Sequence, residues 1–249
     1  MRKLITGLMM IILILICAAA LSESGIAVGD KVSFGNYKQH MLSDNAPAEP
    51  EPITWLVLDV NGSKALLLVE QPLVGMPYNS DANFVYDVTW EKCSLRAWLN
   101  GTFLSDAFSA AEQQAIVLTH HTNPDNSSSG AVISGGNETD DNVFLLSPDE
   151  AARYLKTETS RQCTPTDYAV FTGAGNSWGY YSDDSYHVDQ YHNDVCLWWL
   201  RSPGNIGHYT AYCSFDGSIS YFGQYSGDGS YSVRPAVWVQ KQALVRKGT

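Results

Sequence analysis

Two apolar runs separated by a polar turn dominate the first third of the sequence. Residues 53–60 and 64–69 are rich in β-branched, aromatic and leucine side chains, and Asn61-Gly62 lies between them. Because Asn and Gly both tolerate the positive φ angles of a type I′ turn, the pattern predicts a β-hairpin. A short strand is predicted at 31–35, and the Pro-, Ala- and Glu-rich stretch 45–52 is expected to be a surface loop.

The hydrophobic period changes to that of a helix in the middle of the chain. Leu95, Trp98 and Leu99 have the spacing i, i+3, i+4, which predicts a helix that ends at Asn100-Gly101. Two more helices are indicated by capping boxes, in which a serine precedes a glutamate by three positions. The pairs are Ser109 with Glu112 and Ser147 with Glu150, and Pro148 occupies the first helical position after Ser147.

Strands at both ends with short helices between them indicate an α+β domain built on an antiparallel sheet. Residues 142–146 are a candidate buried strand, whereas 123–141 and 164–194 are polar or glycine-rich and are expected to be long loops. No linker divides the chain. We therefore expect a single domain over residues 28–240.

Residues 1–22 have the pattern of an export signal. A basic start is followed by an apolar run from Leu8 to Cys17 and then by three alanines. We expect a secreted or cell-surface protein with no stable membrane span after cleavage. The alternative is an uncleaved anchor, but the apolar run is shorter than the ~20 residues of a spanning helix. Lipidation of Cys17 is disfavoured, because Ile16 stands where lipoprotein signals have a small residue.

The net charge is strongly negative. It is −11 for the whole chain, and removal of Arg2 and Lys3 with the signal makes it −13. A surface of this sign repels phosphate backbones and anionic lipids. We therefore expect no nucleic-acid partner.

Four cysteines follow the signal: Cys93, Cys163, Cys196 and Cys213. Export permits disulfides, and four cysteines allow three pairings, among which the sequence does not choose. Free buried thiols are an equally good interpretation. None of the spacings is that of a zinc motif.

The segment from Gly204 to Ser232 has an unusual composition. Its 29 residues include five Tyr, six Ser and six Gly but no Lys, Arg or Glu. A solvated surface is normally rich in charged residues, whereas Tyr mixed with Ser and Gly is typical of antibody paratopes. We therefore expect a binding surface here rather than a catalytic centre.

The hairpin within this segment has a predicted register. Apolar and polar residues alternate before Asp216-Gly217, and a three-residue turn keeps the apolar side consistent by placing Ile219 opposite Phe215 and Tyr221 opposite Cys213. The outward residues and those of the flanking loops form the candidate ligand-binding set: Asn205, Ile206, His208, Tyr209, Thr210, Tyr212, Ser214, Asp216, Ser220, Phe222, Tyr225 and Tyr231.

The motifs around this segment are Trp198-Trp199-Leu200-Arg201-Ser202-Pro203-Gly204 and Val233-Arg234-Pro235-Ala236-Val237-Trp238, preceded by 89–100 and 143–147. This frame resembles a family of uncharacterised exported bacterial domains, common in gut Firmicutes. The resemblance covers roughly 28–239. It implies a C-type-lectin-like fold, related to that of formylglycine-generating enzymes, and it is silent on the ligand.

The frame is also similar to the variable domains of proteins diversified by retroelements. Such mutagenesis acts on adenines, so an Asn codon that ends in C never becomes Lys, Gln, Glu, Met or Trp. The stretch from Asn205 to Tyr231 fits this restriction except at Gln224. We therefore hypothesise a diversified display surface for an unknown protein or glycan ligand.

The two motifs that flank the segment 204–232 are expected to be structural. A pair of tryptophans inside an apolar run is typical of a core, and arginines beside Ser-Pro or Pro-Ala are typical of side chains that bind backbone carbonyls or buried acids. The expected frame residues are Trp198, Trp199, Arg201, Arg234 and Trp238. Stacking on sugars and binding of a carboxylate are the alternatives.

Other polar residues give weaker signals. His120-His121, and His187 and His192 around Asp189, have no metal-site spacing and are expected to be solvated. Asp183, Asp184, Asp189 and Asp194 lack the fixed separation of a hydrolase's paired carboxylates.

Calcium-lectin and enzyme signatures are missing too. The sequence contains neither Glu-Pro-Asn nor Trp-Asn-Asp, and Cys196 and Cys213 are too far apart in sequence for the cysteine pair of a formylglycine-generating oxidase. We expect no metal, no cofactor and no catalytic residue. The alternative function is an enzyme or cell-wall-modifying factor on the same fold.

Overall fold

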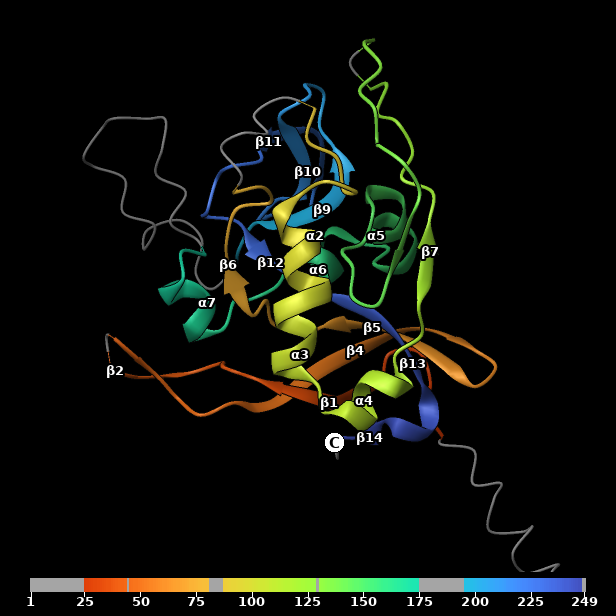
Figure 1. Ribbon diagram of the computed structural model, residues 1–249, viewed down its shortest axis with the longest axis vertical. Coiled ribbons are helices and arrows are strands. Elements are labelled where there is room, and N and C mark those ends of the chain that lie inside the picture. Colours follow the sequence, from red (N-terminus) through yellow and green to blue (C-terminus); the bar gives the residue numbers. More distant parts are fainter. Residues whose placement is uncertain (1–24, 44, 81–86, 129, 175–194, 248–249) are drawn as a thin grey trace, which may run out of the picture.

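The protein is an α+β structure whose described residues form two five-stranded sheets and two short two-stranded ladders. The computed structural model describes residues 25–43, 45–80, 87–128, 130–174 and 195–247. A helical stretch over residues 94–107 lies between the two larger sheets (Figure 1). The predicted α+β class is confirmed, with short helices between strands at both ends of the chain.

The first sheet joins the two ends of the described chain. Its order is β13–β5–β4–β1–β14, and every neighbouring pair is antiparallel. The strands are β1 (Lys31–Tyr37), β4 (Glu51–Asn61), β5 (Lys64–Val69), β13 (Ala236–Gln240) and β14 (Val245–Arg246).

The predicted hairpin is confirmed as β4 and β5, but its turn lies one residue further along. Asn61 pairs with Lys64, so the loop is Gly62-Ser63, and Gly62 supplies the positive φ of 58°. The ladder also shifts register between Val57 and Asp59, an irregularity that residue-type patterns alone do not reveal.

The second sheet has the order β11–β10–β9–β12–β6. Its strands are β6 (Val74–Gly75), β9 (Trp198–Pro203), β10 (Tyr209–Cys213), β11 (Ile219–Tyr225) and β12 (Ser232–Val233). Pairing is antiparallel except between β12 and β9, where Ser232 lies parallel to Trp198. The predicted antiparallel pairing thus holds for the other described strand pairs of this sheet.

The helices are short. They are α2 (Ser94–Trp98), the π-helical turn η1 (Leu99–Phe103), α3 (Leu104–Ala107), α4 (Ala110–Ala115), α5 (Pro148–Tyr154), α6 (Glu158–Arg161), α7 (Asp167–Phe171) and the 3-10 turn η3 (Lys241–Ala243). Both predicted capping boxes are confirmed, at the starts of α4 and α5.

The predicted end of the first helix at Asn100-Gly101 is wrong. The helix continues through η1 into α3, where Phe103 and Ala107 extend its buried side. The Asn100 amide donates to the carbonyl oxygens of Arg96 and Val143 at 3.1 and 2.9 Å. Its side-chain oxygen also accepts from the backbone amides of Asn142 and Val143, so Asn100 links the helix to the segment 142–146 rather than forming a cap.

Two expected loops contain strands. Residues 45–52 include β3 (Ala46–Pro47), which pairs with β2 (Met41–Ser43), and β4 begins at Glu51. In the stretch 123–141, β8 (Thr139–Asp141) pairs with β7 (Thr119–His121). Both ladders are short, so they give little periodic signal.

The expected strand at 142–146 is buried but is not a continuous strand. Phe144 forms an isolated bridge with Ala236 of the first sheet, while the Leu146 carbonyl accepts from the Arg201 amide of the second at 3.0 Å. The segment therefore connects the two sheets instead of belonging to either.

The core is rich in tryptophan. Trp55, Trp90, Trp198 and Trp199 are all fully buried.

The described part of the chain contains no helix with the length and apolar character needed to cross a bilayer.

Candidate functional site

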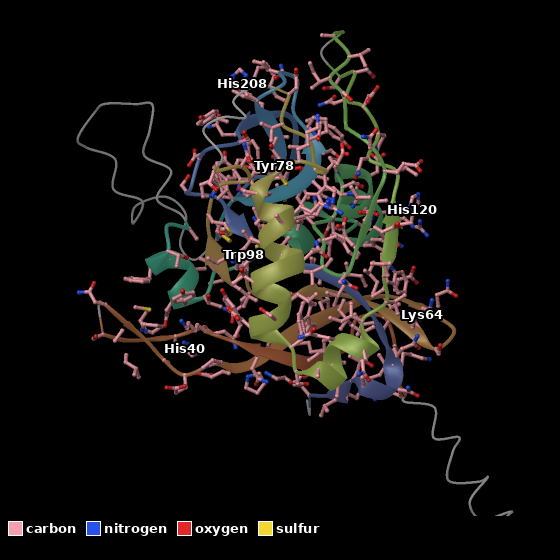
Figure 2. All side chains as sticks on the ribbon, in the orientation of Figure 1. His40, Lys64, Tyr78, Trp98, His120 and His208 are labelled. Atoms are coloured by element: carbon pink, nitrogen blue, oxygen red, sulfur yellow. The ribbon has the colours of Figure 1, made fainter. Side chains whose placement is uncertain are left out.

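Four side chains form a continuous row of rings at one end of the second sheet. Ring centroids are 6.4 Å apart for Phe222 and Tyr209, 4.9 Å for Tyr209 and His208, and 6.2 Å for His208 and Tyr225. We call these four residues the aromatic row. Phe222 is 62% exposed and Tyr225 46% exposed. Figure 2 shows His208 at this end of the molecule, far from His120 and Lys64.

A bulge in β11 presents Phe222 of the row to solvent. Tyr212 pairs with Ser220 and Thr210 with Gln224, so three residues of β11 lie opposite Ala211 alone. These three are Tyr221, Phe222 and Gly223. Because the ladder is interrupted, neighbouring side chains need not alternate between faces, and both Tyr221 and Phe222 are exposed.

The backbone around the bulge is held at several points. The Asn205 amide donates to the Phe222 carbonyl at 2.9 Å, and the Asn126 side-chain amide donates to the Tyr221 carbonyl at 2.8 Å. The Gly223 amide donates to the Ser220 hydroxyl at 3.2 Å. The bulge is therefore a fixed feature with both carbonyls bonded.

Two glycines make this arrangement possible. Gly223 has a φ of 82°, and a Cβ on it would lie 2.8 Å from the Gly204 Cα and 2.9 Å from the Thr210 carbonyl oxygen. A Cβ on Gly204 would lie 2.6 Å from the Phe222 carbonyl oxygen. The close approach of these two backbones positions the aromatic row.

The turn between β10 and β11 differs from the predicted one. Cys213 pairs with Ile219, so the connection is the five residues 214–218 rather than three, and the expected pairs Phe215–Ile219 and Cys213–Tyr221 are wrong. The turn is closed by its own backbone, with the Gly217 amide donating to the Ser214 carbonyl at 2.9 Å.

Two members of the candidate set are buried, so the expectation that they are surface residues is wrong. Tyr231 is 3% exposed and stacks on Trp199, with centroids 4.0 Å apart and planes at 18°. Burial raises the pKa of Tyr231 far above that of a free tyrosine. Thr210 is fully buried next to the bulge, where it pairs with both Pro203 and Gln224.

The remaining candidates differ in exposure. Tyr212 packs edge-on against Tyr231 at 5.0 Å and therefore joins the inner stack rather than the aromatic row. Ile206 and Asp216 are exposed, and the half-exposed members are Asn205, Ser214 and Ser220.

Residue-type patterns miss two exposed aromatics. Tyr221 and Phe215, both assigned to the apolar side, are 40% and 36% exposed. The Tyr221 hydroxyl lies 3.4 Å from an Asp149 carboxylate oxygen. Gly223 inside an otherwise regular strand pattern is the signal that indicates a bulge and hence this change of face.

Four of the five expected frame residues are buried. Arg234 is 3% exposed, donates to the Val69 carbonyl at 2.9 Å and lies over the Trp198 ring at 5.1 Å. Arg201, 5% exposed, forms a two-point ion pair with Glu150 and donates to the Leu145 carbonyl at 2.9 Å. Of the frame residues, Trp238 on β13 is half-buried.

The histidine pair of β7 does not form a joint site. His120 is exposed and bonds the Asp140 carboxylate at 2.9 Å, whereas His121 is buried against the Phe144 ring at 4.4 Å. The expectation that His121 is solvated is therefore wrong. Burial, followed by the Arg201 charge, lowers the pKa of His121 to about 4.

Nowhere in the described ranges do three His, Cys, Asp or Glu side chains come together as a metal site. The other histidines and acids considered above, at positions 183, 184, 187, 189, 192 and 194, lie outside the described residues.

Comparison with known proteins gives one match. Residues 61–241 match a family described as "Domain of unknown function (DUF6273)". Neither a curated protein nor a solved structure matches the chain. Because the family match runs from the end of β4 past the end of β13 and includes the whole aromatic row, the protein belongs to the DUF6273 family of domains.

Proposed function

We propose that this is an exported ligand-binding protein that contacts a protein or glycan through the aromatic row. One observation carries the proposal: four rings follow one another at one end of the second sheet, and glycines and backbone hydrogen bonds hold in place the bulge that carries Phe222. A monomer has no folding reason to keep Phe222 62% exposed at the centre of such a rigid feature.

The chemistry of the row suits stacking rather than ion pairing. Phe and Tyr offer large contact area with few rotatable bonds, so little conformational entropy is lost when a ligand covers them. No Lys, Arg or Glu occurs between Gly204 and Ser232.

The scaffold that we propose is the C-type-lectin-like fold, on the strength of the resemblance at 198–204 and 233–238. An α+β architecture with two sheets, short helices and long connections is compatible with it. Export, and with it a location outside the cytoplasm, is proposed from the pattern of residues 1–22.

The test is a binding screen with matched variants. The full chain is screened against an immobilised glycan library, peptidoglycan fragments and whole bacterial cells. Phe222→Ala combined with Tyr225→Ala removes two exposed rings, and loss of two contact residues at about 1–2 kcal/mol each weakens binding roughly thirty-fold or more. Phe171→Ala is the control, because Phe171 on α7 is also exposed, at 48%, and lies outside the row.

The expected result is at least one probe that binds wild type and Phe171→Ala alike and that the double variant loses, with all three melting temperatures within a few degrees. A probe that all three proteins bind equally would contradict the proposed site. Failure of every glycan and cell probe would contradict the proposed ligand classes.

A further inference from the structure

Two of the four described cysteines lie side by side. The Sγ atoms of Cys163 and Cys196 are 3.7 Å apart, and the Cys196 amide donates to the Cys163 carbonyl at 3.0 Å. A direct backbone hydrogen bond between the two residues keeps their backbones close, as a disulfide requires, since its Cα atoms are about 4.4–6.8 Å apart. Side-chain rotation that brings the sulfurs about 1.7 Å closer is the remaining step.

The other two cysteines have different surroundings. Cys93 is the N-cap of α2, and its sulfur accepts from the Arg96 amide at 3.4 Å. The Cys213 sulfur lies within 4.0 Å of the Arg161 carbonyl and 3.8 Å of the Ser214 carbonyl. Burial raises the pKa of each of these two thiols to about 12.

From this geometry we infer that Cys163 and Cys196 form a disulfide when the protein folds in the presence of a disulfide oxidant, such as a thiol–disulfide oxidoreductase or a small-molecule disulfide. One cysteine, as its thiolate, attacks the oxidant's S–S bond and forms a mixed disulfide, releasing one thiol. The second thiolate attacks that mixed disulfide, and a second thiol leaves. The oxidant gains two electrons and both protons, and the protein gains one S–S bond.

The bond would link the end of α6 to the start of β9, the strand that contains Trp198 and Trp199. Cys163 follows α6, and Cys196 stands two residues before β9. At the end of α6, two residues before Cys163, the Arg161 carbonyl accepts from the Trp198 indole at 3.0 Å and from Arg234 at 3.5 Å. A covalent link here would hold α6 against the start of the strand that carries both central tryptophans. Because both cysteines are buried, the link forms during folding rather than afterwards.

Peptide mapping tests the pairing directly and independently of ligand binding. The full chain is refolded with oxidised and reduced glutathione, alkylated without reduction and digested with trypsin. No Lys or Arg lies between positions 162 and 200, so one peptide, 162–201, carries both cysteines, whereas Cys93 and Cys213 fall in other peptides. We expect peptide 162–201 to be unalkylated and lighter by two hydrogen masses. Two alkyl groups on it, or its linkage to the peptide that contains Cys213, would overturn the inference.

Stability gives a second readout. Closure of a loop of this length should raise the melting temperature by roughly 8–15 °C, a difference that a reductant removes. Cys163→Ala combined with Cys196→Ala should melt at the same temperature with and without reductant. Cys213→Ala, which also removes a buried thiol, should keep the reductant-dependent shift. Loss of the shift in Cys213→Ala alone would assign the bond to another pair.

Discussion

Replacement of Gly223 by alanine is expected to destabilise the protein by about 2–4 kcal/mol. Two costs add at this position. A φ of 82° is unfavourable for a residue with a Cβ by about 1–2 kcal/mol. The new methyl group would lie 2.8 Å from the Gly204 Cα and 2.9 Å from the Thr210 carbonyl oxygen, a backbone overlap whose relief costs about 1–3 kcal/mol. The lower entropy of the unfolded alanine chain offsets about 0.4–1 kcal/mol.

Two other glycines separate these contributions. Gly62 has a positive φ of 58°, but no atom lies within 4 Å of the position that a Cβ would occupy, so Gly62→Ala should cost only about 1 kcal/mol. Gly101 in η1 has neither a positive φ nor a neighbour within 4 Å. Gly101→Ala should therefore stabilise the protein by about 0.5–1 kcal/mol, through helix propensity.

Urea denaturation of the four proteins measures these differences, and thermal denaturation should show a loss of roughly 5–15 °C for Gly223→Ala. The slope of the urea transition should be the same for all four, because each change acts on the folded state locally. If Gly223→Ala is no more harmful than Gly62→Ala, the close approach of Gly204 and Gly223 does not position the aromatic row.

Four further predictions concern Arg201, Glu150, His121 and Tyr231. Arg201→Met should lower the free energy of unfolding, measured by urea denaturation, by about 3–5 kcal/mol, because it leaves the Glu150 carboxylate without its two-point partner. Adding Glu150→Gln should recover part of the loss. A double variant no more stable than the single one would contradict the pairing. Burial opposes ionisation of Glu150, but Arg201 outweighs it and holds the pKa of Glu150 below 4.5. The stabilisation from this pair is therefore present above about pH 4.5 and is lost as the pH falls further. Glu150→Gln should flatten that part of the plot of stability against pH. The pKa of His121 is lowered to about 4, chiefly by burial, so stability should fall by up to about 3 kcal/mol between about pH 6.5 and pH 4; His121→Gln should remove this slope, and an unchanged slope would assign it to another group. Tyr231→Ala should cost about 3–5 kcal/mol through loss of the stack on Trp199, and a variant that instead melts like wild type but loses ligand binding would return Tyr231 to the binding surface.

Local features of the fold can be predicted from the sequence because their partners are close along the chain. The boxes Ser109–Glu112 and Ser147–Glu150 each close over three residues, and the hairpin around Gly62 needs only a turn between two apolar runs. The composition of 204–232 likewise identifies the segment that holds the aromatic row. None of these depends on distant contacts.

Long-range contacts decided the rest. Alternation predicts which side of a regular strand a residue occupies, but Tyr221 and Phe222 lie in a bulge held by Asn205 and Asn126, and the regular pattern therefore fails there. Residues 142–146 are apolar enough for a strand, but they lie between the two sheets and pair with a different one at each end.

The α+β class, the helix caps, the first hairpin and the segment that carries the exposed rings all follow from residue types and their spacing. That Tyr231 belongs to the core and Phe222 to the surface, and that Cys163 lies next to Cys196, follows from the folded arrangement alone. The physical reason is that composition and periodicity report what a segment prefers to bury, whereas burial itself depends on which distant backbone packs against it.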